Sequence, residues 1–158
     1  DLSSAFPRLV KFTAPENGTV TSMSVRIVSS AGAADIHAAI YADNSGLPDA
    51  LRAKSSTPTA GGGAGTWCDI TMDTAVISLD IVSGTVYWLA WWASNANKSY
   101  AYTTGTTNQF SRPNIVPTYP TWDDPFGSAI QADSLYSIYA TYTPSGGGLG
   151  KLILRTPA

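Results

Sequence analysis

The chain has 158 residues, which is enough for one domain with a sizeable hydrophobic core. Only 13% of the residues are charged and the formal net charge is −2. Nucleic acid and anionic membrane surfaces are therefore not expected partners, because both bind clustered Lys and Arg. Membrane insertion is not expected either, since no apolar run reaches the ~20 residues that span a bilayer.

Short segments with the sequence pattern of β-strands, separated by turns, follow one another along the chain. The first contains Pro7, which lacks a backbone donor and therefore favours the edge of a sheet. In the second, Met23, Val25 and Ile27 share one face and polar residues share the other, as in a half-buried antiparallel strand. The predicted strands are residues 5–13, 19–28, 35–42, 50–55, 66–72, 83–93, 100–104, 135–143 and 151–155, and residues 75–81 lead into the strand at 83–93.

The central strand is expected in the run from Ser83 to Ala93, which holds no charged residue. Alternate side chains of a strand point to opposite faces, and both faces are apolar here, with Trp88 on one and Trp91 on the other. This pattern predicts a strand covered on both sides, or covered on one side and open to a ligand on the other. Residues 100–104 are expected to pair with it.

The region from Gly105 to Ser128 has no strand or helix period. A connection of this length in a compact domain is usually functional or disordered, and its prolines and aromatic residues argue against disorder. Further along, the Gly-rich residues 145–150 precede an apolar C-terminal strand. We expect residues 1–144 to form the body, residues 145–150 a hinge, and residues 151–158 a C-terminal strand and tail.

No segment combines a helical period with capping signals. Many short strands with turns at intervals of about 8–12 residues are typical of a sandwich or a barrel. The predicted fold class is all-β, an antiparallel β-sandwich of jelly-roll type.

Four short segments carry a resemblance to known domains. They are FTAP at residues 12–15, AIYADNSGLP at 39–48, GTW at 65–67 and SGTVYWLA at 83–90. In this order they resemble bacterial extracellular β-sandwich domains of the choice-of-anchor R type, in which one strand reads I-Y-x-D-x-x-G-x-P and a later one G-T-x-Y-W-L. The resemblance covers roughly residues 6–93. Such domains are similar to carbohydrate-binding modules and to virion or appendage modules, which implies display outside a cell.

Composition points to the same location. With so few charges, the surface must be mostly Ser, Thr, Asn and Gly, a composition common in extracellular proteins. The chain starts at Asp1 without a Met, as expected of a processed mature protein or an excised domain. We expect a protein that is secreted or displayed on a cell or virion.

Residues for catalysis are scarce, and an enzyme is not expected. Glu16 is the sole Glu, so a paired-carboxylate glycosidase would need two Asp across a cleft. The single His37 would need a Ser brought from elsewhere in the chain, and we expect it to be a solvated or hydrogen-bonded strand residue. One His and one Cys are too few for a zinc site. Cys68 is expected to be a buried, inert thiol.

A structural calcium ion is the one cofactor considered. Asp43, Asp123 and Asp124 supply hard oxygen ligands of the kind that calcium prefers. The favoured alternative is that Asp43 bonds the backbone of its own turn. No other cofactor is expected.

Aromatic residues suggest a binding function. Sugars stack their C–H faces on aromatic rings while polar side chains bind their hydroxyls, and a rigid ring loses little side-chain entropy. Region 105–128 contains both kinds of residue. The predicted ligand-binding residues are Gln109, Arg112, Asn114, Tyr119, Trp122 and Asp123. The alternative is that Trp122 and Phe126 plug the end of the sandwich.

The C-terminal strand suggests a second function. Leu152, Ile153 and Leu154 form an apolar strand, which must return to its own sheet or add to a neighbour's. The loose hinge favours contact with another subunit. The first hypothesis is thus a non-catalytic extracellular module that binds a glycan. The alternative is a structural subunit of a filament, virion surface or tail fibre, assembled by exchange of terminal strands.

Overall fold

The computed structural model describes residues 6–115, 117–147 and 150–154, the last of these as backbone only. Among these residues there are sixteen strands and no helix, so none of the described chain could cross a membrane as a helix. The strands are β1 (Arg8–Thr13), β2 (Gly18–Ser30), β3 (Asp35–Asn44), β4 (Leu47–Lys54), β5 (Thr59–Ala60), β6 (Trp67–Thr71), β7 (Thr74–Ala75), β8 (Asp80–Ile81), β9 (Val86–Ala93), β10 (Lys98–Tyr100), β11 (Tyr102–Thr104), β12 (Phe110–Pro113), β13 (Ala129–Ala132), β14 (Ser134–Tyr136), β15 (Ile138–Pro144) and β16 (Gly150–Leu154).

Eight strands form the first sheet, in the order β13-β12-β1-β9-β3-β4-β7, with β5 also paired to β3. The apolar strand β9 lies at its centre, where Trp88 is in register with Lys11 of β1 and with Tyr41 of β3. Because β1 lies between β12 and β9, the expectation of an edge position from Pro7 is wrong. Strand pairing begins at Arg8, so the missing donor of Pro7 interrupts no ladder.

Six strands form the second sheet, in the order β10-β2-β15-β16, with β6 and β8 also paired to β2. The long strand β2 thus pairs with four others. Strands β11 and β14 form a separate two-stranded ribbon. The predicted pairing of residues 100–104 with the central strand is therefore wrong. Both edges of β9 are already occupied by β1 and β3, which leaves no edge for them.

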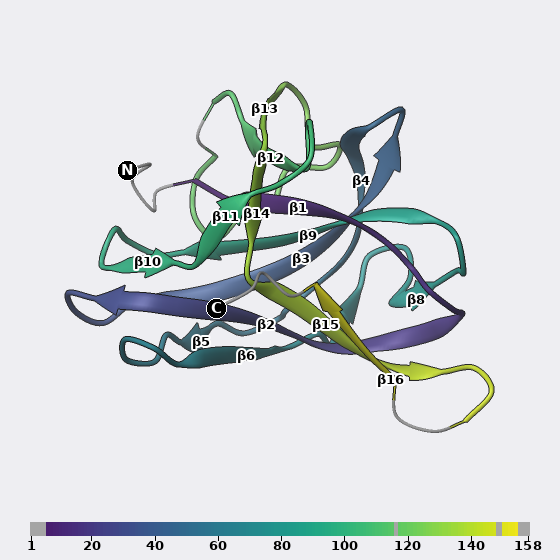
Figure 1. The fold of residues 1–158 in the computed structure, drawn as a ribbon, viewed down its shortest axis with the longest axis horizontal. Coiled ribbons are helices and arrows are strands. Elements are labelled where there is room, and N and C mark those ends of the chain that lie inside the picture. The colour runs from purple at the N-terminus through teal and green to yellow at the C-terminus, as the bar shows by residue number, and fades with distance from the viewer. Residues whose placement is uncertain (1–5, 116, 148–149, 155–158) are drawn as a thin grey trace.

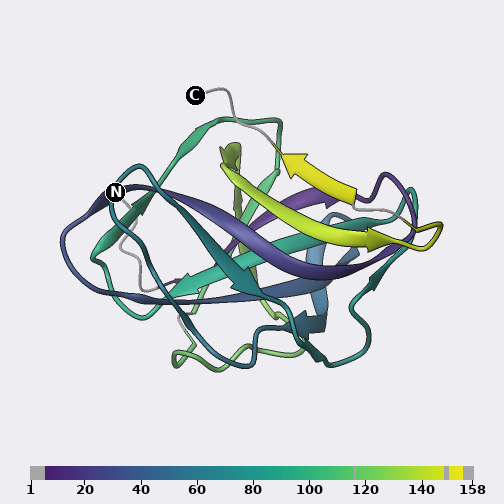
Figure 2. The same cartoon turned by 90° about the horizontal axis from the view of Figure 1, so that it is seen from below.

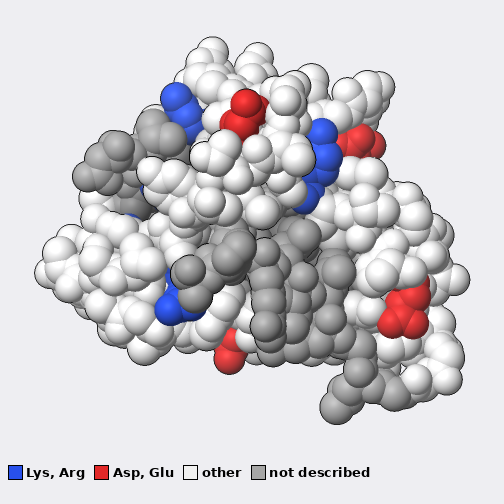
Figure 3. Space-filling model, in the orientation of Figure 1, with Lys and Arg blue, Asp and Glu red and all other residues white. Residues whose placement is uncertain are grey.

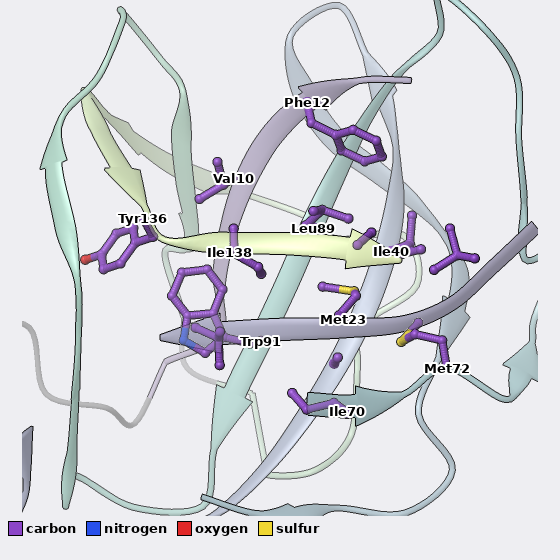
Figure 4. Close-up of a cluster of buried hydrophobic side chains, with 14 of the residues drawn as sticks. Val10, Phe12, Met23, Ile40, Ile70, Met72, Leu89, Trp91, Tyr136 and Ile138 are labelled. Atoms are coloured by element: carbon purple, nitrogen blue, oxygen red, sulfur yellow. The ribbon is translucent and has the colours of Figure 1, made fainter. Parts of the chain in front are cut away.

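The two sheets face one another across a main core, and every strand pair formed by the described residues is antiparallel (Figures 1 and 2). Met23, Val25 and Ile27 are buried there, as the alternation in their strand predicts. Figure 4 shows apolar side chains of both sheets converging between the ribbons. The all-β antiparallel sandwich is thus confirmed, while the jelly-roll topology stays a prediction.

A second hydrophobic cluster, the outer core, covers the other face of the first sheet. The segment 117–127 supplies Trp122 and Phe126, which pack on residues of β1, β3, β4 and β9. Its buried members are Leu9, Ala39, Tyr41, Leu51, Trp88, Ala90, Trp92, Trp122 and Phe126. Trp91 meanwhile lies in the main core. The central strand is therefore covered on both sides, the first of the two arrangements that its sequence predicts.

The C-terminal strand β16 pairs with β15 of the same chain, with Ile153 in register with Tyr139. A turn precedes it, in which the Gly147 N–H donates to the Pro144 carbonyl at 3.1 Å and Gly147 has a φ of 84°, a backbone conformation suited to glycine. The chain thus returns to its own sheet, which is the outcome that the sequence analysis did not favour. The side chains of Leu152, Ile153 and Leu154 lie outside the described residues.

Candidate ligand-binding cleft

Trp122, a predicted ligand-binding residue, belongs to the outer core. Only 8% of its surface is exposed, and its ring meets those of Tyr41 and Trp92 edge-on, with centroids 6.3 Å and 5.6 Å apart. The prediction that Trp122 faces a ligand is therefore wrong, and the plug interpretation holds. The outer face of the first sheet is apolar, so burial of this ring removes apolar surface from water on both partners.

Tyr119 and Asp123 also serve the attachment of this segment. Tyr119 is half-buried edge-on against Trp92 at 5.2 Å, and its hydroxyl donates to the Asp35 carbonyl at 3.1 Å. Burial, with a smaller contribution from Asp35, raises the pKa of Tyr119 to about 12. Asp123 is exposed, and its backbone carbonyl accepts the Tyr41 hydroxyl at 2.8 Å.

The other three predicted residues do not join them. The Arg112 guanidinium lies over the Phe6 ring at 4.9 Å, and the exposed Asn114 donates its backbone N–H to Ser128. Gln109 uses its side-chain oxygen to accept both the backbone N–H and the hydroxyl of Thr106. Of the six predicted residues, only Gln109 lines either of two depressions formed by the described residues, a shallow one of about 400 Å³ beside β1.

Two of the three candidate calcium ligands, Asp43 and Asp124, use their carboxylates to accept hydrogen bonds from the protein. The two carboxylate oxygens of Asp43 accept the indole N–H of Trp88 at 2.8 Å and the backbone N–H of Gly46 at 3.0 Å. Asp124 accepts the backbone N–H of Leu51 at 3.0 Å. No group of three or more His, Cys, Asp or Glu gathers within the described part of the chain. The turn interpretation accounts for the Asp43 oxygen that accepts from Gly46, and the Trp88 indole accounts for the other.

Ser55 lies next to the single histidine. Its hydroxyl oxygen is 3.0 Å from Nδ1 of His37 and accepts the Ala38 N–H at 3.1 Å. Burial lowers the pKa of His37, which favours the neutral ring. Since Ser55 is itself buried, its hydroxyl lies beneath the surface and not in a substrate cleft. His37 is thus a hydrogen-bonded strand residue, as expected.

Cys68 is buried, as the sequence predicts. Burial, followed by the nearby Asp69 carboxylate, raises the pKa of its thiol to about 11. The reactive thiolate is therefore disfavoured at neutral pH.

A cleft of about 350 Å³ opens where β10 leaves the second sheet and β11 joins the ribbon. The strands that contribute to it, β10, β11, β14 and the start of β1, lie in the left half of the molecule in Figure 1. Backbone hydrogen bonds through Ala101 hold this junction, because its N–H donates to Arg26 and its carbonyl accepts from Ser137. The lining residues are Arg8, Lys98, Ser99, Tyr100, Tyr102, Ser134 and Tyr136.

Tyr102 gives the cleft an exposed aromatic ring, with 66% of its surface accessible. Its ring lies 5.3 Å from that of Tyr136, which packs in turn on Trp91 at 5.0 Å and on Phe110 at 5.2 Å. Figure 4 shows Tyr136 at the edge of the main core, with its hydroxyl directed away from the other labelled side chains. The exposed ring is therefore supported by a stack that continues into the core.

Two buried basic residues, Arg8 and Lys98, line the cleft. Arg8 is 6% exposed, and its guanidinium lies over the Tyr100 ring at 5.3 Å. Lys98 is 5% exposed, and its ammonium donates to the Ser30 hydroxyl at 2.6 Å and to the Gly62 carbonyl at 2.8 Å. Burial raises the pKa of Tyr100, while the charge of Arg8 opposes the shift. No acidic residue is among the described residues that line the cleft.

A second aromatic surface lies on the outer face of the second sheet. Trp67 is 41% exposed, and its ring is 4.9 Å from that of Tyr139. Beneath them the buried Ser24 hydroxyl donates to Asp69, and Arg26 is the strand neighbour of Trp67. On the face drawn in Figure 3, charged side chains are few and scattered among uncharged ones. This aromatic pair lies on a sheet face, whereas Tyr102 borders a concave site.

The sequence analysis missed the cleft because its residues come from four separate strands. The one local signal was the alternation of Lys98, Tyr100 and Tyr102, which places a cation and two aromatic rings in close succession. Comparison of the chain with family models, curated proteins and solved structures gave no match. The function of the cleft must therefore be inferred from its own geometry.

Proposed function

We propose that the protein is a non-catalytic extracellular binding module that recognises a glycan in the cleft formed by β1, β10, β11 and β14. The observation that carries the proposal is the exposed ring of Tyr102 at a concave site lined by hydroxyl groups and cations. A pyranose ring presents C–H groups to an aromatic face and hydroxyls at its rim. The cleft offers partners for both.

Size and rigidity support this proposal. A volume of about 350 Å³ lies at the small end of the range for ligand pockets, ~300–1,000 Å³. Tyr102 is in register with Tyr136 on the paired strand, so its backbone is held by the ribbon. A ring fixed before the ligand arrives loses little entropy on binding. Ser99 and Ser134 add hydroxyls that can donate to or accept from a sugar.

Glycan binding by single-ring variants tests the proposal. Wild-type protein is screened on a glycan array, and binding of the best ligand is measured by calorimetry. Tyr102→Ala should weaken binding about tenfold, which corresponds to ~1.4 kcal/mol, because it removes the stacking surface, whereas Tyr102→Phe should bind like wild type. Thermal unfolding of both variants should stay within a few degrees of wild type because the ring is exposed.

Trp67→Ala is the matched control, because it removes an exposed aromatic ring that lies outside the cleft. If Trp67→Ala abolishes binding while Tyr102→Ala does not, the ligand lies on the outer face of the second sheet and the cleft is not the site. An array without any bound glycan would overturn the proposed function.

The strand order supports a second candidate, a structural subunit of a filament, virion surface or tail fibre. Strand β16 ends the second sheet, and β15 is its one partner among the described strands. An edge of this kind can pair with a strand of another subunit. Light scattering on the intact chain separates the candidates, since a monomer favours the binding module and a trimer or polymer favours the subunit. Deletion of residues 149–158 should dissociate an assembly, or lower the melting temperature of a monomer.

A further inference from the structure

We infer that the glycan bound in this cleft carries an anionic group, a carboxylate or a sulfate ester, that lies against Arg8 and Lys98. This inference rests on the proposed function and adds the chemical class of the ligand. It is carried by the charge of the lining, the burial of the two basic side chains and the partners that hold them.

The charge of the lining departs from that of the whole chain. The protein has 9 basic and 11 acidic residues, so acids are in excess overall. The balance of charge is reversed in the cleft, because two of the seven described residues that line it are basic and none of the seven is acidic. Low-dielectric walls strengthen the field of such a site and favour a ligand of opposite sign.

Within the described part of the chain, the Lys98 ammonium meets no carboxylate. Its ammonium carries three donors, and the two acceptors that it meets, the Ser30 hydroxyl and the Gly62 carbonyl, are both neutral. Removing a cation from water is costly unless an opposite charge compensates it. Since the described residues give Lys98 no carboxylate, an anionic ligand in the adjoining cleft would supply the missing charge.

Arg8 contributes geometry as well as charge. Its guanidinium carbon lies 5.3 Å from the centroid of the Tyr100 ring, and burial of the side chain limits its motion. A planar guanidinium forms paired hydrogen bonds with a carboxylate or a sulfate. Tyr102 on the same cleft offers the stacking surface for the sugar ring. The site thus combines two buried cations, which can bind an anion, with the exposed aromatic ring of Tyr102.

The first test needs only wild-type protein. An array of neutral, uronate-containing and sulfated oligosaccharides is screened at low and at high salt. The anionic oligosaccharides should bind at least about tenfold more tightly than neutral ones at low salt, and the difference should shrink as salt screens the charges. Comparison of the uronate-containing with the sulfated oligosaccharides shows whether the bound group is a carboxylate or a sulfate ester.

The outcomes separate the inference from the proposed function. Binding of neutral and anionic glycans alike, lost in Tyr102→Ala, would overturn the anionic ligand and leave the glycan-binding function standing. Absence of any glycan binding would overturn both.

Variants provide the second test. Arg8→Gln should weaken binding of polygalacturonate at least about tenfold, and Arg8→Lys should lose less because it keeps the charge. Arg52→Gln is the matched control, since that guanidinium also lies over a tyrosine ring, that of Tyr87 at 5.5 Å, but outside the cleft. Equal binding by Arg8→Gln and Arg52→Gln, both folded by circular dichroism, would overturn the inference.

Discussion

The outer faces of the two sheets use the same residue types for opposite purposes. On the first sheet, Trp88 and Trp92 lie under the segment that carries Trp122, and all three rings are buried. On the second sheet, Trp67 and Tyr139 form a ring pair that the described chain leaves partly open to solvent. The difference teaches that a cluster of aromatic residues does not identify a ligand surface by itself. What decides is whether another segment of the chain covers it.

Of the substitutions that test this comparison, Trp88→Ala should lower the stability of the protein most. The side chain is fully buried, and its indole N–H donates to Asp43 at 2.8 Å. We expect the free energy of unfolding to fall by ~3–5 kcal/mol, as for other truncations of buried tryptophans. Urea unfolding measures this loss. An unchanged midpoint would show that the outer core does not contribute to stability.

Trp122→Ala should destabilise the protein by somewhat less, ~2–4 kcal/mol. Its buried indole nitrogen has no hydrogen-bond partner among the described residues, so removal of this group also relieves an unsatisfied donor. Trp122→Phe should therefore lose far less stability than Trp122→Ala. Both variants should bind glycan as the wild type does, and a loss of binding in a variant that still folds would place the ligand on this segment.

Trp67→Ala should cost only ~0.5–1.5 kcal/mol, the contribution of an exposed aromatic pair. A double-mutant cycle with Tyr139→Ala measures the interaction of the two rings directly. A loss as large as that of Trp88→Ala would mean that the second sheet has a covered outer face after all.

The smallest effect expected is a pH dependence of stability at the rim of the outer core. His37 lies beneath the Tyr119 ring, with centroids 5.6 Å apart, and burial lowers its pKa in the folded state. As the pH falls, the unfolded chain therefore takes up the proton first, so stability is full above pH ~6.5 and declines below it. Asp35 opposes this shift and Lys54 adds to it.

Melting temperatures between about pH 8 and pH 5.5 test this sign. His37→Gln should flatten the profile relative to wild type. A wild type that becomes more stable as the pH falls through this range would contradict the lowered pKa.

Local patterns in the sequence were sufficient to predict the sandwich. They were not sufficient to predict that residues 117–127 cover the outer face of its first sheet. Met23, Val25 and Ile27 alternate because one face of their strand is buried, and this information is contained in the strand itself. The position of Trp122 depends on a sheet face built from strands distant in sequence. The same reason explains the wrong edge assignment of Pro7 and the wrong partner for residues 100–104, since strand neighbours are chosen by non-local pairing. The cleft could not be predicted because four strands meet to form it.

The long strand β2 has a consequence for the order in which the protein can fold during synthesis. Its partner β15 follows much later in the chain, and Thr21 bonds the Thr141 carbonyl across a separation of 120 residues. The second sheet therefore cannot close until the ribosome has released the segment around residue 140. Until then β2 presents an unpaired edge, which slows folding and exposes the nascent chain to wrong pairing.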